Sequence, residues 1–105
     1  MKNNLANVAF VFALAAAIPA AAGVVHVDMK NIGFAPAKTA AKVGDTVEWK
    51  NSDFVAHTAT ARNHSFDVTI PANKTASAVL KKAGTIAYYC RFHPNMTGEI
   101  DVSAR

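Results

Sequence analysis

The sequence predicts an all-β domain, a Greek-key β-sandwich or flattened barrel of about seven to eight short strands. Apolar and polar residues alternate with a period of two in several short segments. Turn-forming Gly, Pro, Asn and Asp residues separate these segments, and residues 23–105 show no helical periodicity. The chain of 105 residues has room for a single domain.

Residues 1–22 are predicted to be a helical signal peptide that is cleaved from a domain comprising residues 23–105. Lys2 provides a basic start, residues 8–18 form an apolar core, and Ala20-Ala21-Ala22 offers small residues to a signal peptidase. A membrane anchor is the alternative, but the proline and alanines that end the apolar stretch argue against it. We therefore expect a periplasmic protein that has no membrane association after cleavage.

The first half of the remaining chain predicts three strands. Residues 25–29 alternate between apolar and polar side chains, as expected for a half-buried strand. Residues 39–43 form a short strand that ends at the turn pair Gly44-Asp45. Residues 46–50 alternate again, with Val47 and Trp49 on one face. This alternation places one face of each strand against a core.

The second half predicts the other strands. Residues 54–61 carry almost no charge, so we expect their backbone to be covered on both sides. Residues 66–70 form an extended piece, and residues 75–80 and 85–90 form two further strands. Residues 99–102 close the domain. Short strands of this kind, with turn signals between them, favour a β-sandwich or flattened barrel.

Cys90 is the only cysteine of the chain, so no internal disulfide can stabilise this small domain. In the predicted strand 85–90 its thiol points to the same face as Ile86 and Tyr88. An unpaired thiol in an oxidising compartment is a liability unless it is buried or bound to a metal. The export signal and the single cysteine together favour a metal-ligand role for Cys90.

Three soft or borderline metal donors lie close together near the end of the chain. Cys90, His93 and Met96 are spaced at positions i, i+3 and i+6. A straight strand cannot direct them to one point, whereas a tight loop after the strand can. A set of two histidines, one cysteine and a weak axial methionine is typical of a blue-copper electron-transfer site.

The second histidine of such a site is predicted to be His57, which lies in the uncharged segment 54–61. His64 is the alternative, but its neighbours place it in a polar loop. His26 lies on the polar face of the first predicted strand. The local sequence therefore favours His57 as the ligand contributed by a separate segment.

The spacing Cys90-x-x-His93-x-x-Met96 resembles that of the cupredoxin family of type I blue copper proteins, as do Val43–Trp49, His57 and Gly84–Cys90. Its short loop is similar to that of amicyanin-like members, whereas plastocyanin and pseudoazurin have longer loops. The resemblance implies a cupredoxin-like fold with one type I copper ion at one end. The metal ligands implied are His57, Cys90, His93 and Met96.

Thr58 departs from the family pattern. Many relatives carry Asn at this position, where its hydrogen bonds tie the strand of the first histidine to the ligand loop. We therefore expect a different hydrogen-bond arrangement beside the cysteine sulfur in this chain, which affects the reduction potential more than the identity of the metal.

The resemblance implies a small exported monomer that is not an enzyme and that shuttles single electrons by Cu(I)/Cu(II) cycling. The implied redox partners are a periplasmic dehydrogenase and a cytochrome c. An apolar docking patch would surround the exposed edge of the His93 imidazole. The candidates for this patch are Phe92, Pro94, Val55, Ala56 and Phe34.

The charge of the chain is modest. Lys2 is the only charged residue of residues 1–22, so residues 23–105 carry ten Lys and Arg, seven Asp and Glu, and a net charge of +3. The basic residues are scattered, which argues against a nucleic-acid partner. A copper-delivery protein remains an alternative function, as does a metal-free or zinc-loaded interaction domain.

Overall fold

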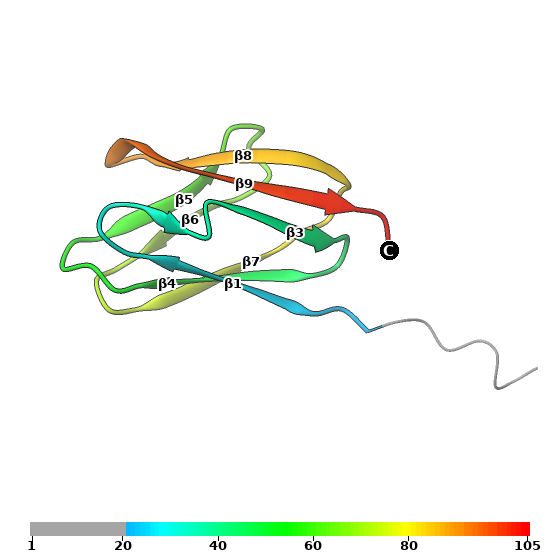
Figure 1. Cartoon of the computed structure of the whole chain (residues 1–105), viewed down its shortest axis with the longest axis horizontal. Coiled ribbons are helices and arrows are strands. Elements are labelled where there is room, and N and C mark those ends of the chain that lie inside the picture. Colours follow the sequence, from blue (N-terminus) through cyan, green and yellow to red (C-terminus); the bar gives the residue numbers. More distant parts are fainter. Residues whose placement is uncertain (1–20) are drawn as a thin grey trace, which may run out of the picture.

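The computed structural model describes residues 21–105, which form two β-sheets packed face to face (Figure 1). The predicted signal peptide, residues 1–22, lies outside the described residues except for Ala21 and Ala22. Among residues 21–105 there is no helix that could span a membrane.

Nine strands make up this part of the chain. They are β1 (Val24–Met29), β2 (Phe34–Ala35), β3 (Lys38–Lys42), β4 (Thr46–Asn51), β5 (His57–Ala61), β6 (Asp67–Ile70), β7 (Thr75–Val79), β8 (Gly84–Cys90) and β9 (His93–Ser103). The first sheet has the order β2-β1-β4-β7 and the second the order β3-β9-β8-β5-β6. The predicted all-β sandwich is confirmed, and the two-residue strand β2 accounts for the count above eight.

Two pairs of neighbouring strands run parallel. Strand β1 pairs in parallel with β4, and β3 pairs in parallel with β9, whereas the other pairs are antiparallel. Parallel neighbours require a crossover, because a hairpin can only join antiparallel strands. The chain therefore passes between the two sheets several times, and each sheet combines distant parts of the sequence (Figure 1).

The aromatic side chains pack in the centre of the sandwich. The Tyr88 ring lies 4.6 Å from the Phe34 ring, 5.7 Å from the Trp49 ring and 5.8 Å from the Phe66 ring, measured between centroids. Trp49 Nε1 donates a hydrogen bond to the Tyr88 hydroxyl at 3.3 Å. Because the domain has no disulfide, this cluster and the aliphatic residues around it supply the hydrophobic stabilisation.

Gly98 on β9 lies opposite Tyr88 on β8. A Cβ atom at this position would lie 2.5 Å from Cζ of the tyrosine ring. Only glycine leaves room for the ring to lie over the neighbouring strand. Gly98 therefore determines how the central aromatic residue packs.

Two predicted boundaries were wrong. Residues 54–61 were expected to be covered throughout, but Phe54 is 96% exposed and only His57–Ala61 is buried. His93 and Met96 were expected in a loop, but both belong to β9. The reason is that only the turn Arg91-Phe92 separates β8 from β9, so pairing resumes at His93.

The start of β9 is nevertheless irregular. Tyr89 pairs with Thr97, whereas the next residue, Cys90, pairs with His93. The residues between His93 and Thr97 are therefore extra on the β9 side, as in a β-bulge. This bulge contains Met96, whose side chain is only 2% exposed.

Candidate metal centre

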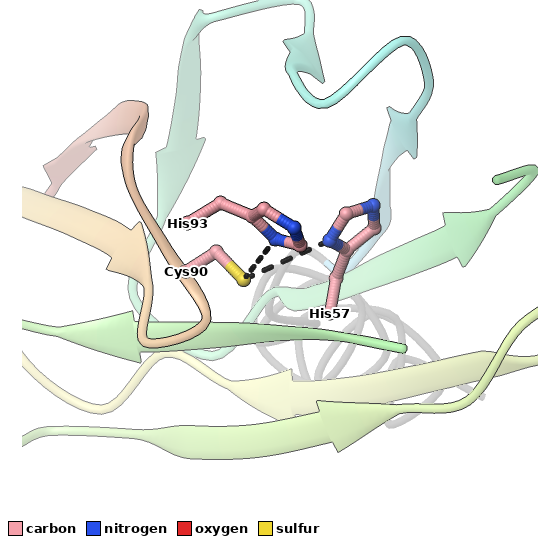
Figure 2. A group of neighbouring side chains, drawn as sticks. All are labelled: His57, Cys90 and His93. Atoms are coloured by element: carbon pink, nitrogen blue, oxygen red, sulfur yellow. Dashed lines mark hydrogen bonds between the residues drawn. The ribbon is translucent and has the colours of Figure 1, made fainter. Parts of the chain in front are cut away.

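Three of the predicted ligands meet at one end of the sandwich. His57 is the first residue of β5, Cys90 is the last residue of β8, and His93 is the first residue of β9. One potential ligand atom from each residue lies within 4.8 Å of the others. The Cys90 Sγ atom lies 3.7 Å from Nδ1 of each histidine (Figure 2). The cluster thus directs one sulfur and two nitrogens to a common point.

These distances show that one ion could contact all three donors. Metal–sulfur and metal–nitrogen bonds of about 2.3 Å and about 2.0 Å place the two donor atoms about 3.5 to 3.7 Å apart. The observed 3.7 Å for both histidines agrees with that separation. Two imidazoles and one thiolate are the equatorial donors found in blue-copper sites.

The three side chains differ in their exposure. His57 and Cys90 are fully buried, and His93 is half-buried. The centre is therefore shielded from water on the side of β5 and β8. The His93 imidazole alone approaches the molecular surface.

The outer nitrogen of His57 is fixed by Asp53, a residue that the sequence analysis did not single out. Nε2 of His57 lies 2.7 Å from Oδ2 of Asp53. Because a carboxylate accepts, Nε2 carries the proton and Nδ1 directs its lone pair toward the cluster. A carboxylate that orients a ligand histidine in this way is common in metal sites. In the sequence, the only sign of this contact is that an acidic residue lies four positions before His57.

Asp53 is itself held by the turn between β1 and β2. Its two carboxylate oxygens accept hydrogen bonds from the backbone N–H groups of Asn31 at 2.8 Å and Ile32 at 3.0 Å. Partial burial raises the pKa of Asp53, but the hydrogen bonds from His57, Ile32 and Asn31 outweigh it and lower the pKa. The carboxylate is therefore ionised where it faces His57.

The backbone of this turn is unusual. Asn31 and Ile32 have φ values of 54° and 56°. Such values are rare for a β-branched residue such as isoleucine and cost free energy. Asp53 binds both N–H groups, which stabilises the left-handed backbone and links the turn to His57.

Thr58 connects β5 to the turn that follows Cys90. Its backbone N–H donates to the Cys90 Sγ atom at 3.3 Å, and its hydroxyl accepts a hydrogen bond from the Arg91 N–H at 2.8 Å. The same hydroxyl lies 2.9 Å from the Thr60 hydroxyl, which donates to Asp67 at 2.8 Å. Since Thr60 gives its only proton to Asp67, Thr58 donates to Thr60. Thr58 thus ties the two segments together through a hydroxyl chain.

The alternative histidines lie elsewhere. His64 is exposed in the loop between β5 and β6, where its φ is 66°. His26 is exposed on β1, and its Nδ1 atom lies 3.2 Å from a carboxylate oxygen of Glu48. Neither residue belongs to the His57-Cys90-His93 cluster.

Exposed apolar side chains flank the half-buried His93. Val55 and Phe92 are 46% and 51% exposed, and Ala56 and Pro94 are also exposed. Phe34 was predicted in this patch, which is wrong, because its ring is buried against Tyr88. The exposed residues come from the segments that immediately precede His57 and surround His93.

Comparisons with known proteins agree with the fold and the centre. A family model described as a cupredoxin-like domain matches residues 4–102. The methylamine utilization protein MauL of Methylorubrum extorquens is 32% identical over 104 residues, which cover 94% of this chain and 91% of MauL. The similarity therefore extends over nearly the whole of both chains.

Three solved structures illustrate the structural similarity. A purple cupredoxin from Nitrosopumilus maritimus has 26% identity and a TM-score of 0.69, covering 75% of this chain and 99% of its own. A reduced amicyanin variant has 27% identity and a TM-score of 0.66, covering 85% of this chain and 89% of its own. A Cu(I) form of another amicyanin variant is also similar. Copper in amicyanin and the His-Cys-His cluster of this chain agree with the predicted cofactor. On its fold, its sequence and its cluster of donors, this chain belongs to the cupredoxin-like family.

Proposed function

We propose that this chain binds one copper ion through His57, Cys90, His93 and Met96 and carries single electrons between redox proteins. The observation that supports this most directly is the equal distance of 3.7 Å from Cys90 Sγ to Nδ1 of each histidine. Copper in such a site alternates between Cu(I) and Cu(II) and accepts or donates one electron. The chain itself makes and breaks no substrate bond, so it is not an enzyme.

The residues around the centre suit this role. The Thr58 N–H at 3.3 Å from the sulfur stabilises negative charge on the Cys90 thiolate. The hydrogen bond from His57 to Asp53 fixes the orientation of the buried imidazole. Met96, buried in the bulge of β9, would hold the ion through its thioether as the fourth proposed ligand. His57 and Cys90 are thus held by hydrogen bonds to other protein groups.

The proposed docking surface is the exposed apolar group Phe92, Pro94, Val55 and Ala56 around His93. An electron carrier needs a small interface that dissociates quickly, because each partner is bound only for one transfer. The proposed partners are a dehydrogenase and a cytochrome c in the periplasm, and the carrier acts as a monomer. Electrons would enter and leave through the half-buried imidazole edge.

A visible absorption spectrum tests the proposal. Copper-free protein is titrated with Cu(II), and we expect an intense thiolate-to-copper band that disappears on reduction and is absent in Cys90→Ser. The potential is then measured by voltammetry, followed by electron exchange with a cytochrome c. A Met96→Leu variant should keep the colour but raise the potential, because it would remove the thioether and leave the cysteine and the two histidines in place. A colourless protein in the presence of Cu(II) would contradict the proposal.

Copper delivery is the second candidate function. The half-buried His93 leaves one edge of the centre accessible to an acceptor protein. A delivery protein releases its copper quickly to chelators, whereas an electron carrier retains it through many redox cycles. The rate of copper transfer to a chelator, measured beside the rate of electron exchange, distinguishes the two.

A further inference from the structure

Asp45 lies in the turn between β3 and β4 and contacts residues near both ends of the described chain. This turn lies at the opposite end of the sandwich from the turn between β8 and β9 (Figure 1). Its Oδ1 atom accepts a hydrogen bond from the Gly23 N–H at 2.8 Å, and its Oδ2 atom accepts one from the Lys42 N–H at 2.9 Å. The Arg105 guanidinium also pairs with Oδ1. Asp45 as a whole residue is only 7% exposed. A buried charge is thus aimed at the backbone nitrogen of Gly23.

Gly23 immediately precedes the first strand of the sheet, β1. Its carbonyl accepts a hydrogen bond from the Thr46 N–H at 2.9 Å, and the ladder between β1 and β4 follows directly from Val24. Its nitrogen is bonded to Asp45. Ala21 and Ala22, which precede it, are exposed and belong to the small-residue run that suits a signal peptidase.

We propose that the chain is cleaved between Ala22 and Gly23 and that the new α-ammonium group of Gly23 forms an ion pair with Asp45. Hydrolysis breaks the peptide C–N bond. Water supplies the hydroxyl that makes Ala22 a carboxylate and the proton that Gly23 retains, and the amine takes a further proton from solvent. A neutral amide donor thereby becomes a cationic donor to the same carboxylate. This inference concerns processing of the chain and does not depend on copper.

The neighbouring charged side chains determine how strongly the Gly23 ammonium group is attracted to Asp45. Asp45 and Arg105 are the charged side chains that the described contacts place at the Gly23 nitrogen. Asp45 attracts the ammonium group directly, whereas Arg105 shares the same oxygen and weakens the attraction. Arg105 also donates to the Ala21 carbonyl at 2.8 Å and the Val43 carbonyl at 3.0 Å. Cleavage removes the first of these acceptors and leaves Arg105 bound to Val43 and Asp45.

The pair has a defined dependence on pH. An ordinary α-amino group has a pKa of about 7.7 to 8.0, and a directly bonded carboxylate raises it in the folded state. The stabilisation is therefore complete below the pKa of the unfolded chain and is lost as the pH rises through the higher folded value. A pKa raised by about one unit corresponds to a folding equilibrium constant about tenfold larger at neutral pH.

Mass spectrometry of the exported protein tests the cleavage position, and we expect the chain to start at Gly23. Two forms of this chain, with a free amine and with an N-acetyl group, are then compared in urea unfolding. Acetylation keeps the N–H donor but removes the charge, so it is a matched control. We expect the free amine to unfold at higher urea near neutral pH and the difference to vanish at alkaline pH. Equal midpoints, or a different first residue, would overturn the proposal.

Two variants test whether Asp45 is the partner of the amine. In Asp45→Asn the difference between the free and acetylated forms should disappear, whereas in Asp28→Asn, which changes an exposed acid on β1, it should remain. If Asp45→Asn folds poorly, the pKa of the Gly23 amine in the otherwise unchanged chain, measured by NMR, gives the answer without any variant. A value above the ordinary range supports the ion pair, and an ordinary value contradicts it.

Discussion

The imidazole Nε2 atom of His57 lies 2.7 Å from Oδ2 of Asp53, four residues earlier in the chain. Asp53 also accepts the N–H groups of Asn31 and Ile32. One carboxylate therefore joins the turn after β1 to a proposed copper ligand on β5. The orientation of His57 depends on this contact as well as on its own strand.

Replacement of Asp53 by Asn should weaken copper binding by about 10- to 100-fold, a typical cost for losing the partner of a ligand histidine. The amide keeps the size of the side chain but removes the charge opposite the imidazole. Copper affinity is measured by competition with a chelator of known affinity. Asp28→Asn is the control, and an unchanged affinity in Asp53→Asn would contradict this role.

Replacement of Thr58 by Val should lower the free energy of unfolding by about 1 to 3 kcal/mol, because the part-buried Arg91 N–H loses its acceptor and the buried Thr60 hydroxyl loses a donor. Thr58→Ser retains the hydroxyl and should keep most of the stability. The free energies are compared by urea unfolding of the copper-free protein. If Val is tolerated better than Ser, the hydroxyl chain is not what holds the turn.

Replacement of Gly98 by Ala should destabilise the fold by about 1 to 3 kcal/mol, as for other overpacked cores. The added Cβ would lie 2.5 Å from Cζ of Tyr88, so the ring or the strand must move. Gly33→Ala is the control, because its nearest contact would be an ordinary 3.5 Å to the Lys30 carbonyl. Thermal unfolding of the two variants should differ clearly, and similar midpoints would show that the ring adapts without cost.

Alkaline pH should destabilise the protein through Tyr88. Burial raises the pKa of Tyr88 to about 12, although the hydrogen bond from Trp49 opposes the shift. Above about pH 10 the unfolded chain loses this proton while the folded chain keeps it, so stability falls as the pH rises. Urea unfolding of Tyr88→Phe should show a weaker pH dependence over this range. An identical slope in the two proteins would contradict the assignment.

Replacement of His57 by Ala should abolish the blue colour of the copper-loaded protein, whereas His64→Ala should leave it unchanged. The Nδ1 atom of His57 lies 3.7 Å from the Cys90 sulfur, whereas His64 is exposed and does not belong to the cluster. Visible absorption at matched copper loading measures the outcome. The opposite result would assign the second histidine to His64.

The sequence predicted the candidate centre better than its surroundings. Cys90, His93 and Met96 are close in the chain, so their spacing marks them as candidate ligands, and His57 is marked by its uncharged neighbours. The structure brings His57, Cys90 and His93 together. Asp53 was missed because its role depends on backbone N–H groups that only folding brings near. Phe34 was misplaced for the same reason, since the ring of Tyr88 covers it.

The strands were predictable where alternation was regular, as around Trp49. The start of β9 was not, because the bulge interrupts the period of two between His93 and Thr97. The hydroxyl chain from Thr58 to Asp67 was also not predictable in detail. It joins residues on two strands through threonines that local patterns do not distinguish from ordinary strand residues.

Strand β9, which follows all the other described strands in the chain, lies inside the five-stranded sheet, between β3 and β8. Without β9, strand β3 would lack its partner in this sheet, and His93 would be missing from the cluster with His57 and Cys90. The five-stranded sheet and the candidate centre can therefore form only after β9 has been synthesised, so folding of this sheet and formation of the metal cluster are coupled events.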